Sequence, residues 1–175
     1  MIPVVLALDC STRNLGWCCA APGANLPAHG LIKLPGMKDL GMLHAAVRNS
    51  LVDLIERHKP GVLCWCRPMF RDQQTAAEAL LGVAAVAHLT AYDYGLRAVV
   101  EAETTARKYV LGRGTFGLRD PVTKKILKGS GSRQAKAAAL AWCAARGIET
   151  TSDDVADAAV LHQYVSRFVM ARRMA

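Results

Sequence analysis

The sequence predicts an α/β fold in one domain spanning residues 1–175. Three short apolar segments come first, at 4–8, 17–20 and 29–34, and they have the composition of consecutive strands. Helical periodicity then alternates with two further short apolar runs, at 62–66 and 96–100. Three meandering strands followed by strand–helix alternation indicate a mixed sheet with helices on both faces.

The first three strands can be justified from their own residues. The run at 4–8 consists of apolar, mostly branched residues, which is typical of a strand buried on both faces. Turn residues at 11–16 separate it from a second extended apolar segment, so the two form a predicted hairpin. Pro27 and Pro35 bound the third strand.

We expect five helices, at 38–58, 75–91, 103–111, 132–146 and 153–172. Apolar residues recur at helical spacing in the first, and Ser132 and Gly147 are suitable caps for the fourth. Pro60 and Gly61 follow the first helix and lead into the strand at 62–66. A loop rich in glycine and basic residues, around 112–131, separates the third helix from the fourth. Because no linker or repeat interrupts this order, we expect a single domain with one flexible basic loop.

Composition narrows the classes of function. The chain is 52% hydrophobic and 21% charged, which is typical of a globular protein. It has 22 Lys and Arg residues against 14 Asp and Glu, a net charge of +8 that favours a polyanionic partner such as nucleic acid. We expect no apolar run of the ~18 residues that are needed to cross a bilayer. The first residues lack the basic start of a secretory signal. We therefore expect a cytoplasmic protein that does not bind membranes.

The predicted helix at 75–91 is apolar nearly all round and rich in alanine. Such a helix is either buried in the core or shared with a second subunit. Its small residues would allow close approach of two backbones in a symmetric dimer. Both interpretations stay open from the sequence.

Asp9 interrupts the apolar run at the end of the first strand. A carboxylate is seldom buried without a partner, because desolvating its charge costs several kcal/mol or more. Asp9 therefore either caps the following turn through the amides of Ser11 and Thr12 or binds a cation.

Two further carboxylates, Asp154 and Asp157, lie at the start of the last helix. Acidic residues are common there because they cap the helix and interact with its dipole. Their i, i+3 spacing also places them on one face. A carboxylate pair on a packed helix, together with a third carboxylate at a strand end, can hold hard divalent cations such as Mg²⁺, which suits phosphodiester cleavage.

Basic residues dominate 107–136, where only Asp120 opposes them. The candidates for binding DNA phosphates are Arg107, Lys108, Arg113, Arg119, Lys124, Lys125, Lys128, Arg133 and Lys136. The alternative is a solvated surface loop. Phe70 and Phe116 are candidates for stacking on nucleic-acid bases, with local packing as the alternative for each.

Three motifs carry a resemblance to a known family. They are the strand and turn at 5–12 with Gly16 and Trp17, the segment at 105–114, and the acidic segment at 152–158. In this order and spacing they resemble the RuvC-type Holliday junction resolvases of the ribonuclease H-like superfamily, in particular the compact phage and bacterial type. The element order and the length match along essentially the whole chain.

The resemblance implies a five-stranded ribonuclease H-like sheet whose first three strands are antiparallel. It also implies a homodimeric endonuclease, dependent on Mg²⁺ or Mn²⁺, that resolves four-way DNA junctions by paired nicking. Asp9, Asp154 and Asp157 would hold the metal, and the helix at 75–91 would pair the subunits. The expected location is the cytoplasm, with the nucleoid or as a phage product in a bacterial host, or else an organelle.

One position departs from the family pattern. The resemblance places a glutamate at the end of the fourth strand, and Cys66 stands there as the fourth site residue. A thiol is a poor ligand for Mg²⁺. Asp72, in a turn, and Glu78, inside a helix, show no physical reason to face Asp9. The alternatives to an active resolvase are a copy disabled at Cys66, whether by natural divergence or by deliberate substitution, and a non-catalytic protein that binds branched DNA on the same scaffold. A more distant alternative is an RNA-directed nuclease of the same superfamily.

Overall fold

The computed structural model describes residues 3–21, 24–68, 74–117, 120–123, 125, 127 and 129–169. The strands are β1 (Val5–Cys10), β2 (Asn14–Ala20), β3 (Ala28–Lys33), β4 (Val62–Cys66) and β5 (Arg97–Glu101). The helices are α1 (Leu40–His58), α2 (Gln74–Asp93), α3 (Glu103–Leu111), α4 (Ser130–Ala144) and α5 (Asp153–Tyr164), followed by the π-helical segment η1 (Val165–Val169). Every predicted element is present. The last helix is α-helical as far as Tyr164, and its predicted end at 170–172 lies outside the described residues.

The five strands form one sheet in the order β3-β2-β1-β4-β5. β1, β2 and β3 are antiparallel neighbours, whereas β4 runs parallel to both β1 and β5. The predicted mixed sheet with three antiparallel strands is therefore confirmed. Because β1, β4 and β5 are parallel, their carboxyl ends meet at one edge of the sheet.

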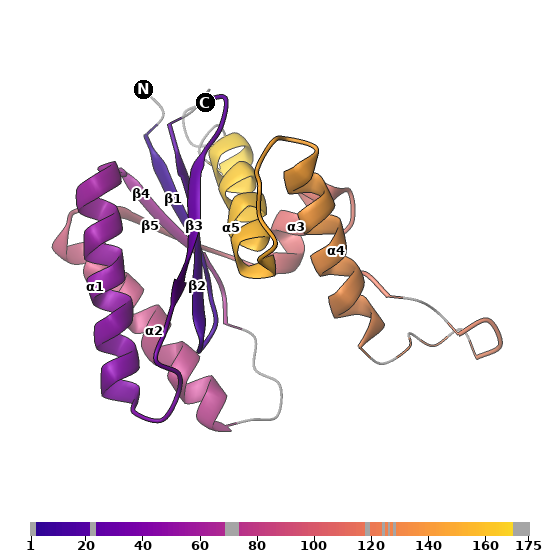
Figure 1. Ribbon diagram of the computed structural model, residues 1–175, viewed down its shortest axis with the longest axis horizontal. Coiled ribbons are helices and arrows are strands. Elements are labelled where there is room, and N and C mark those ends of the chain that lie inside the picture. Colours follow the sequence, from indigo (N-terminus) through magenta and orange to yellow (C-terminus); the bar gives the residue numbers. More distant parts are fainter. Residues whose placement is uncertain are drawn as a thin grey trace.

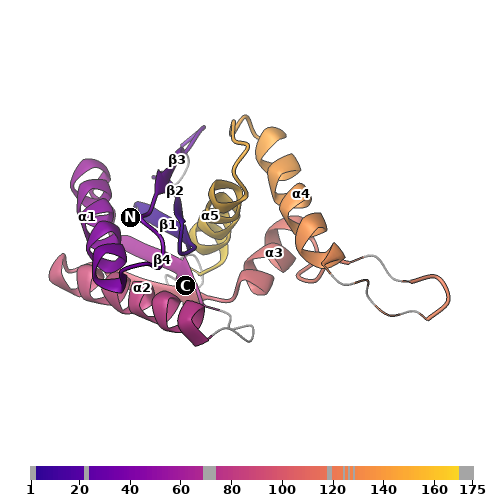
Figure 2. The same cartoon turned by 60° about the horizontal axis from the view of Figure 1, so that its bottom comes forward.

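Helices cover both faces of the sheet, as predicted (Figure 1). α1 and α2 lie on one face, and α5 lies on the other, with α3 and α4 packed beside it (Figure 2). β1 is buried on both sides: Leu6 and Leu8 belong to the core under α1 and α2, and Val5 and Ala7 belong to the core under α5. Since side chains alternate along a strand, Asp9 follows Val5 and Ala7 onto the α5 face.

Helix α2 is buried on one side only. It packs against α1 and β5, while Leu81, Leu89 and Tyr92 are 53%, 63% and 84% exposed on its other side. By length and composition alone, α2 is also the one helix among the described residues that could span a membrane. A helix that covers a sheet passes the same test, so this is weak support for membrane binding. One side of α2 therefore belongs to the core, as the first of the two interpretations predicts, and the other side remains exposed.

Candidate active site

A cleft of about 400 Å³ opens between the end of β1, helix α3 and the N-terminal parts of α4 and α5. Its acidic lining, called the acidic cleft below, consists of Asp9, Glu103, Asp154 and Asp157, with Asp153 at its margin. The structure thus brings together the three carboxylates that the sequence singled out. It adds a fourth, Glu103, that the sequence pattern did not indicate.

Asp9 does not cap the turn that follows it. The backbone amides of Arg13 and Asn14 donate to Oγ of Ser11, at 3.4 and 3.0 Å. Within the described part of the chain, the Asp9 carboxylate accepts no hydrogen bond, so the capping interpretation is wrong. Burial raises the pKa of Asp9 well above its usual value, and the nearby charges of Asp157 and Glu103 raise it further.

Asp154 is held in place by the β-hairpin. Nδ2 of Asn14, the first residue of β2, donates to Oδ2 of Asp154 at 2.8 Å. Burial raises the pKa of Asp154, and the bond from Asn14 opposes this. Ser152 caps α5, since its side chain accepts from the amide of Val155 at 3.4 Å. Neither Asp154 nor Asp157 is therefore needed as the helix cap.

Asp157 is the most buried carboxylate of the acidic cleft, with its side chain 6% exposed. Nε and Nη2 of Arg107 donate to its two oxygens at 3.2 and 2.8 Å, a bidentate pair. Burial raises the pKa of Asp157 from its usual 3.8 to about 6, although the Arg107 charge opposes the rise.

At the margin of the cleft, Lys136 forms an ion pair with Asp153, which lowers the pKa of the Asp153 carboxyl.

Gly16 sets how closely α5 approaches the sheet. It lies opposite Asp9 in the β1–β2 register. A Cβ added at Gly16 would lie 2.3 Å from the backbone carbon and oxygen of Asp154. No side chain fits there, because the neighbouring atoms belong to the backbone of α5. Gly16 thereby allows Asp154 to approach Asp9.

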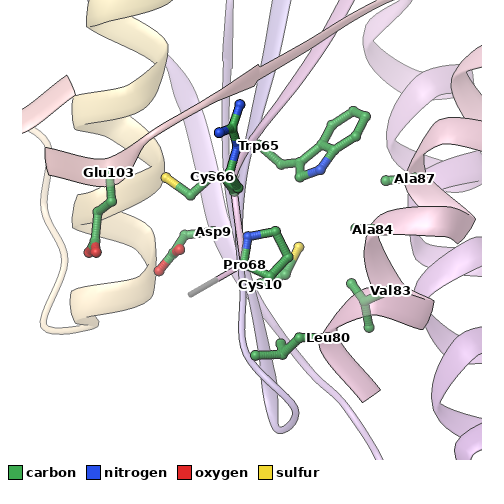
Figure 3. Close-up of a pocket in the computed structure, with 11 residues that line it drawn as sticks. Asp9, Cys10, Trp65, Cys66, Pro68, Leu80, Val83, Ala84, Ala87 and Glu103 are labelled. Atoms are coloured by element: carbon green, nitrogen blue, oxygen red, sulfur yellow. The ribbon is translucent and has the colours of Figure 1, made fainter. Parts of the chain in front are cut away.

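Glu103 reaches the acidic cleft from an element that the sequence analysis did not connect with the site. It is the first residue of α3, two residues beyond the end of β5. It also lines a smaller cavity of about 130 Å³, together with Asp9 and Cys66 (Figure 3). An acidic residue directly after a strand parallel to β4 is the signal that could have revealed it, because functional groups gather outside the carboxyl ends of parallel strands.

Cys66 lies beside Asp9 but does not line the acidic cleft. Figure 3 shows both side chains pointing to the side of the sheet where Glu103 lies, whereas Trp65 points toward α2. Burial and the charge of Asp9 raise the pKa of the Cys66 thiol well above its usual value. A thiol that stays protonated is a still poorer ligand for a hard cation. Glu78 is exposed on α2, and Asp72 lies outside the described residues.

Comparisons with known proteins identify the fold. No protein-family model matches the chain, and no curated protein matches it significantly. RuvC of Thermus thermophilus in complex with a Holliday junction substrate matches with a TM-score of 0.69 and 15% identity, over 98% of this chain and 96% of that one. This chain has the RuvC fold. Two further resolvases are similar. The yeast mitochondrial Holliday junction resolvase Ydc2 matches with a TM-score of 0.56 and 13% identity, over 93% of this chain and 77% of that one. The fowlpox virus Holliday junction resolvase matches with a TM-score of 0.54 and 13% identity, over 93% of this chain and 97% of that one.

On this RuvC fold, the donors of the acidic cleft have the chemistry that a hard divalent cation requires, since they are carboxylate oxygens. No three His, Cys, Asp or Glu side chains among the described residues form a ready-made metal site. Instead, one nitrogen of the protein, Nη2 of Arg107, contacts both Glu103 and Asp157. The acidic cleft thus offers oxygen donors of the kind that hard divalent cations prefer, and a guanidinium stands between two of the carboxylates.

The basic residues predicted to face DNA differ in exposure, and some lie outside the described residues. The prediction that Arg107 contacts DNA is corrected, because its side chain is buried in the acidic cleft and pairs with Asp157. Lys136 is half-exposed beside Asp153. The exposed members are Lys108, Arg113, Lys125 and Arg133. Those outside the described residues are Arg119, Lys124, Lys128 and the aromatic candidate Phe70.

Phe116, the other aromatic candidate, packs locally. Its side chain is 9% exposed, and the Arg113 guanidinium lies 4.7 Å from its ring centroid. These contacts agree with the local-packing alternative for Phe116.

Proposed function

We propose that the chain is a metal-dependent DNA endonuclease that resolves four-way junctions by paired nicking. The observation that carries the proposal is the meeting of Asp9, Asp154 and Asp157 in one cleft of a RuvC fold. The similarity to a RuvC solved with a Holliday junction substrate supports branched DNA as the partner, as does the net charge of +8.

Asp9, Asp154 and Asp157 would hold Mg²⁺ or Mn²⁺, which would supply a Lewis acid for the phosphodiester and lower the pKa of a water molecule. The chain itself contributes the positions of these carboxylates. Asn14 orients Asp154 through its hydrogen bond, and Gly16 brings Asp154 close to the end of β1. The exposed basic residues of α3 and α4 would contact DNA phosphates and set the register of the strand in the cleft.

The test is cleavage of a labelled mobile four-way junction in Mg²⁺ or Mn²⁺, compared with a linear duplex and an RNA–DNA hybrid. We expect paired nicks in the junction and at least about a hundredfold slower cleavage by the Asp9→Asn variant, because a positioned metal ligand is removed. Junction binding by Asp9→Asn should persist, since phosphate contacts lie elsewhere.

Three results would contradict the proposal. Equal cleavage by Asp9→Asn would place the site elsewhere. Preferential cleavage of the hybrid would favour an RNA-directed nuclease. Tight junction binding without cleavage, by both the native chain and Cys66→Glu, would favour the non-catalytic binder of branched DNA.

We also propose that two copies pair through α2. Its exposed residues Leu81, Ala85, Leu89 and Tyr92 recur at helical spacing and form an apolar stripe that no described element of this chain covers. A symmetric dimer would bury this stripe against its own copy and place two acidic clefts on one junction, as paired nicking requires.

The variant Ala85→Arg tests this pairing. We expect it to weaken self-association at least about a hundredfold, because a symmetric interface would bury two unpaired charges. Sedimentation equilibrium measures the association. Ala45→Arg, on the exposed side of α1, is the matched control and should leave it unchanged. A native chain that is monomeric at micromolar concentration would contradict the proposed dimer.

A further inference from the structure

We propose that Glu103 supplies the fourth carboxylate ligand of the metal site, in place of the side chain at Cys66. The inference rests on the proposed nuclease function and names one more ligand for the same site. Cys66 ends β4 and Glu103 begins α3, so the two lie far apart in the sequence. A carboxylate from α3 would then occupy the place in space where a glutamate at position 66 is expected.

The sheet register brings the two positions together. Leu8 lies opposite Trp65, so the next residues, Asp9 and Cys66, are neighbours at the end of β1 and β4. Cys66 in turn lies opposite Glu101 at the end of β5. The chain turns into α3 directly afterwards, and Glu103 is the first helical residue. Glu103 and Asp9 consequently line the same two cavities, on the same side of the sheet (Figure 3).

A second observation shows that Glu103 takes part in binding a positive charge within the acidic cleft. Nη2 of Arg107 contacts the carboxylates of both Glu103 and Asp157. Two carboxylates that share one nitrogen are close enough to share one cation. The Glu103 side chain is 31% exposed, whereas that of Asp157 is 6% exposed, so Glu103 is the more accessible of the two from solvent. A divalent ion would compete with the guanidinium for these oxygens.

A purely structural role for Glu103 makes different predictions. A carboxylate in the first turn of a helix interacts favourably with the dipole, and Glu103 pairs with Arg107 at i, i+4. In that case Glu103→Gln would lower thermal stability without changing metal affinity, and a carboxylate introduced at position 66 would not compensate.

The experiment measures Mn²⁺ binding to the full chain without DNA, from the electron paramagnetic resonance signal of free Mn²⁺, alongside junction cleavage. The variants are Glu103→Gln, Asp9→Asn and the double variant Cys66→Glu with Glu103→Gln. Glu56→Gln, on the exposed side of α1, is the control. We expect Glu103→Gln to weaken Mn²⁺ binding at least about tenfold and to slow cleavage by a similar or larger factor. The double variant should recover both, and Glu56→Gln should match the native chain.

Native Mn²⁺ affinity in Glu103→Gln would overturn the inference, and so would loss of affinity in a folded variant that Cys66→Glu does not restore. Thermal unfolding establishes that each variant is folded. Asp9→Asn distinguishes failure of the Glu103 role from failure of the proposed function. If Asp9→Asn loses binding and cleavage while Glu103→Gln keeps both, only the role of Glu103 is overturned. If neither variant loses either property, the proposed function fails as well.

Discussion

Replacing Arg107 by leucine is expected to lower the free energy of unfolding at pH 7 by about 3–5 kcal/mol. The Arg107 side chain is 10% exposed and forms a bidentate pair with Asp157, whose side chain is 6% exposed. Leucine would leave an ionised carboxylate buried without its cation, and Glu103 would lose its partner as well. Urea unfolding in the presence of a chelator measures the difference.

The effect should depend on pH in a defined direction. The pKa of Asp157 is raised in the folded chain from 3.8 to about 6, so between these values the folded chain binds more protons than the unfolded chain. The contribution of Asp157 to stability therefore falls as pH rises through this window. Loss of Arg107 raises the pKa of Asp157 further. The destabilisation should consequently be largest above pH 6 and should shrink toward pH 4, where Asp157 is neutral in both proteins.

The control for this prediction is Lys108→Leu, which removes a positive charge from the neighbouring, exposed position of α3. We expect it to change stability by less than about 0.5 kcal/mol. Adding Mn²⁺ should recover part of the stability lost in Arg107→Leu, because a cation that binds only the folded chain stabilises it. A loss that is the same at pH 4 and pH 7 would show that Arg107 acts through packing and not through charge.

Gly16→Ala is expected to lower the free energy of unfolding by about 1–3 kcal/mol or more and to slow junction cleavage about a hundredfold. The added methyl group would lie 2.3 Å from the backbone of Asp154, so β2 and the start of α5 would have to separate. That movement would carry Asp154 away from Asp9 and would strain the bond between Asn14 and Asp154.

Gly30→Ala on β3 is the matched control, because the atoms nearest to its Cβ would belong to the Trp17 side chain, at 3.0 Å and beyond. A side chain can shift where a helix backbone cannot, so we expect a smaller loss of stability and normal cleavage. Chemical denaturation and single-turnover junction cleavage report the two effects. Normal cleavage by Gly16→Ala would show that the approach of α5 to β2 does not set the position of Asp154.

The sequence by itself determined the order of elements, the mixed sheet and three of the site carboxylates. These features depend on local patterns: the branched apolar run before Asp9, and the spacing of Asp154 and Asp157 at a helix start. Hydrophobic periodicity shows on which face of its own helix or strand a residue lies. That face does not depend on which other elements pack against it. The same patterns predicted an apolar α2 without showing which of its sides would be covered.

The tertiary structure alone decided which side chains meet. Arg107 was placed on the DNA-facing surface from its charge, yet it pairs with Asp157, fifty positions away along the chain. Ser11, and not Asp9, holds the turn, a competition between two neighbouring acceptors that composition does not resolve. Glu103 joins the site because β5 lies beside β4. Ion pairs and shared cations depend on distances of a few ångströms between elements, and those distances arise only when the elements pack together.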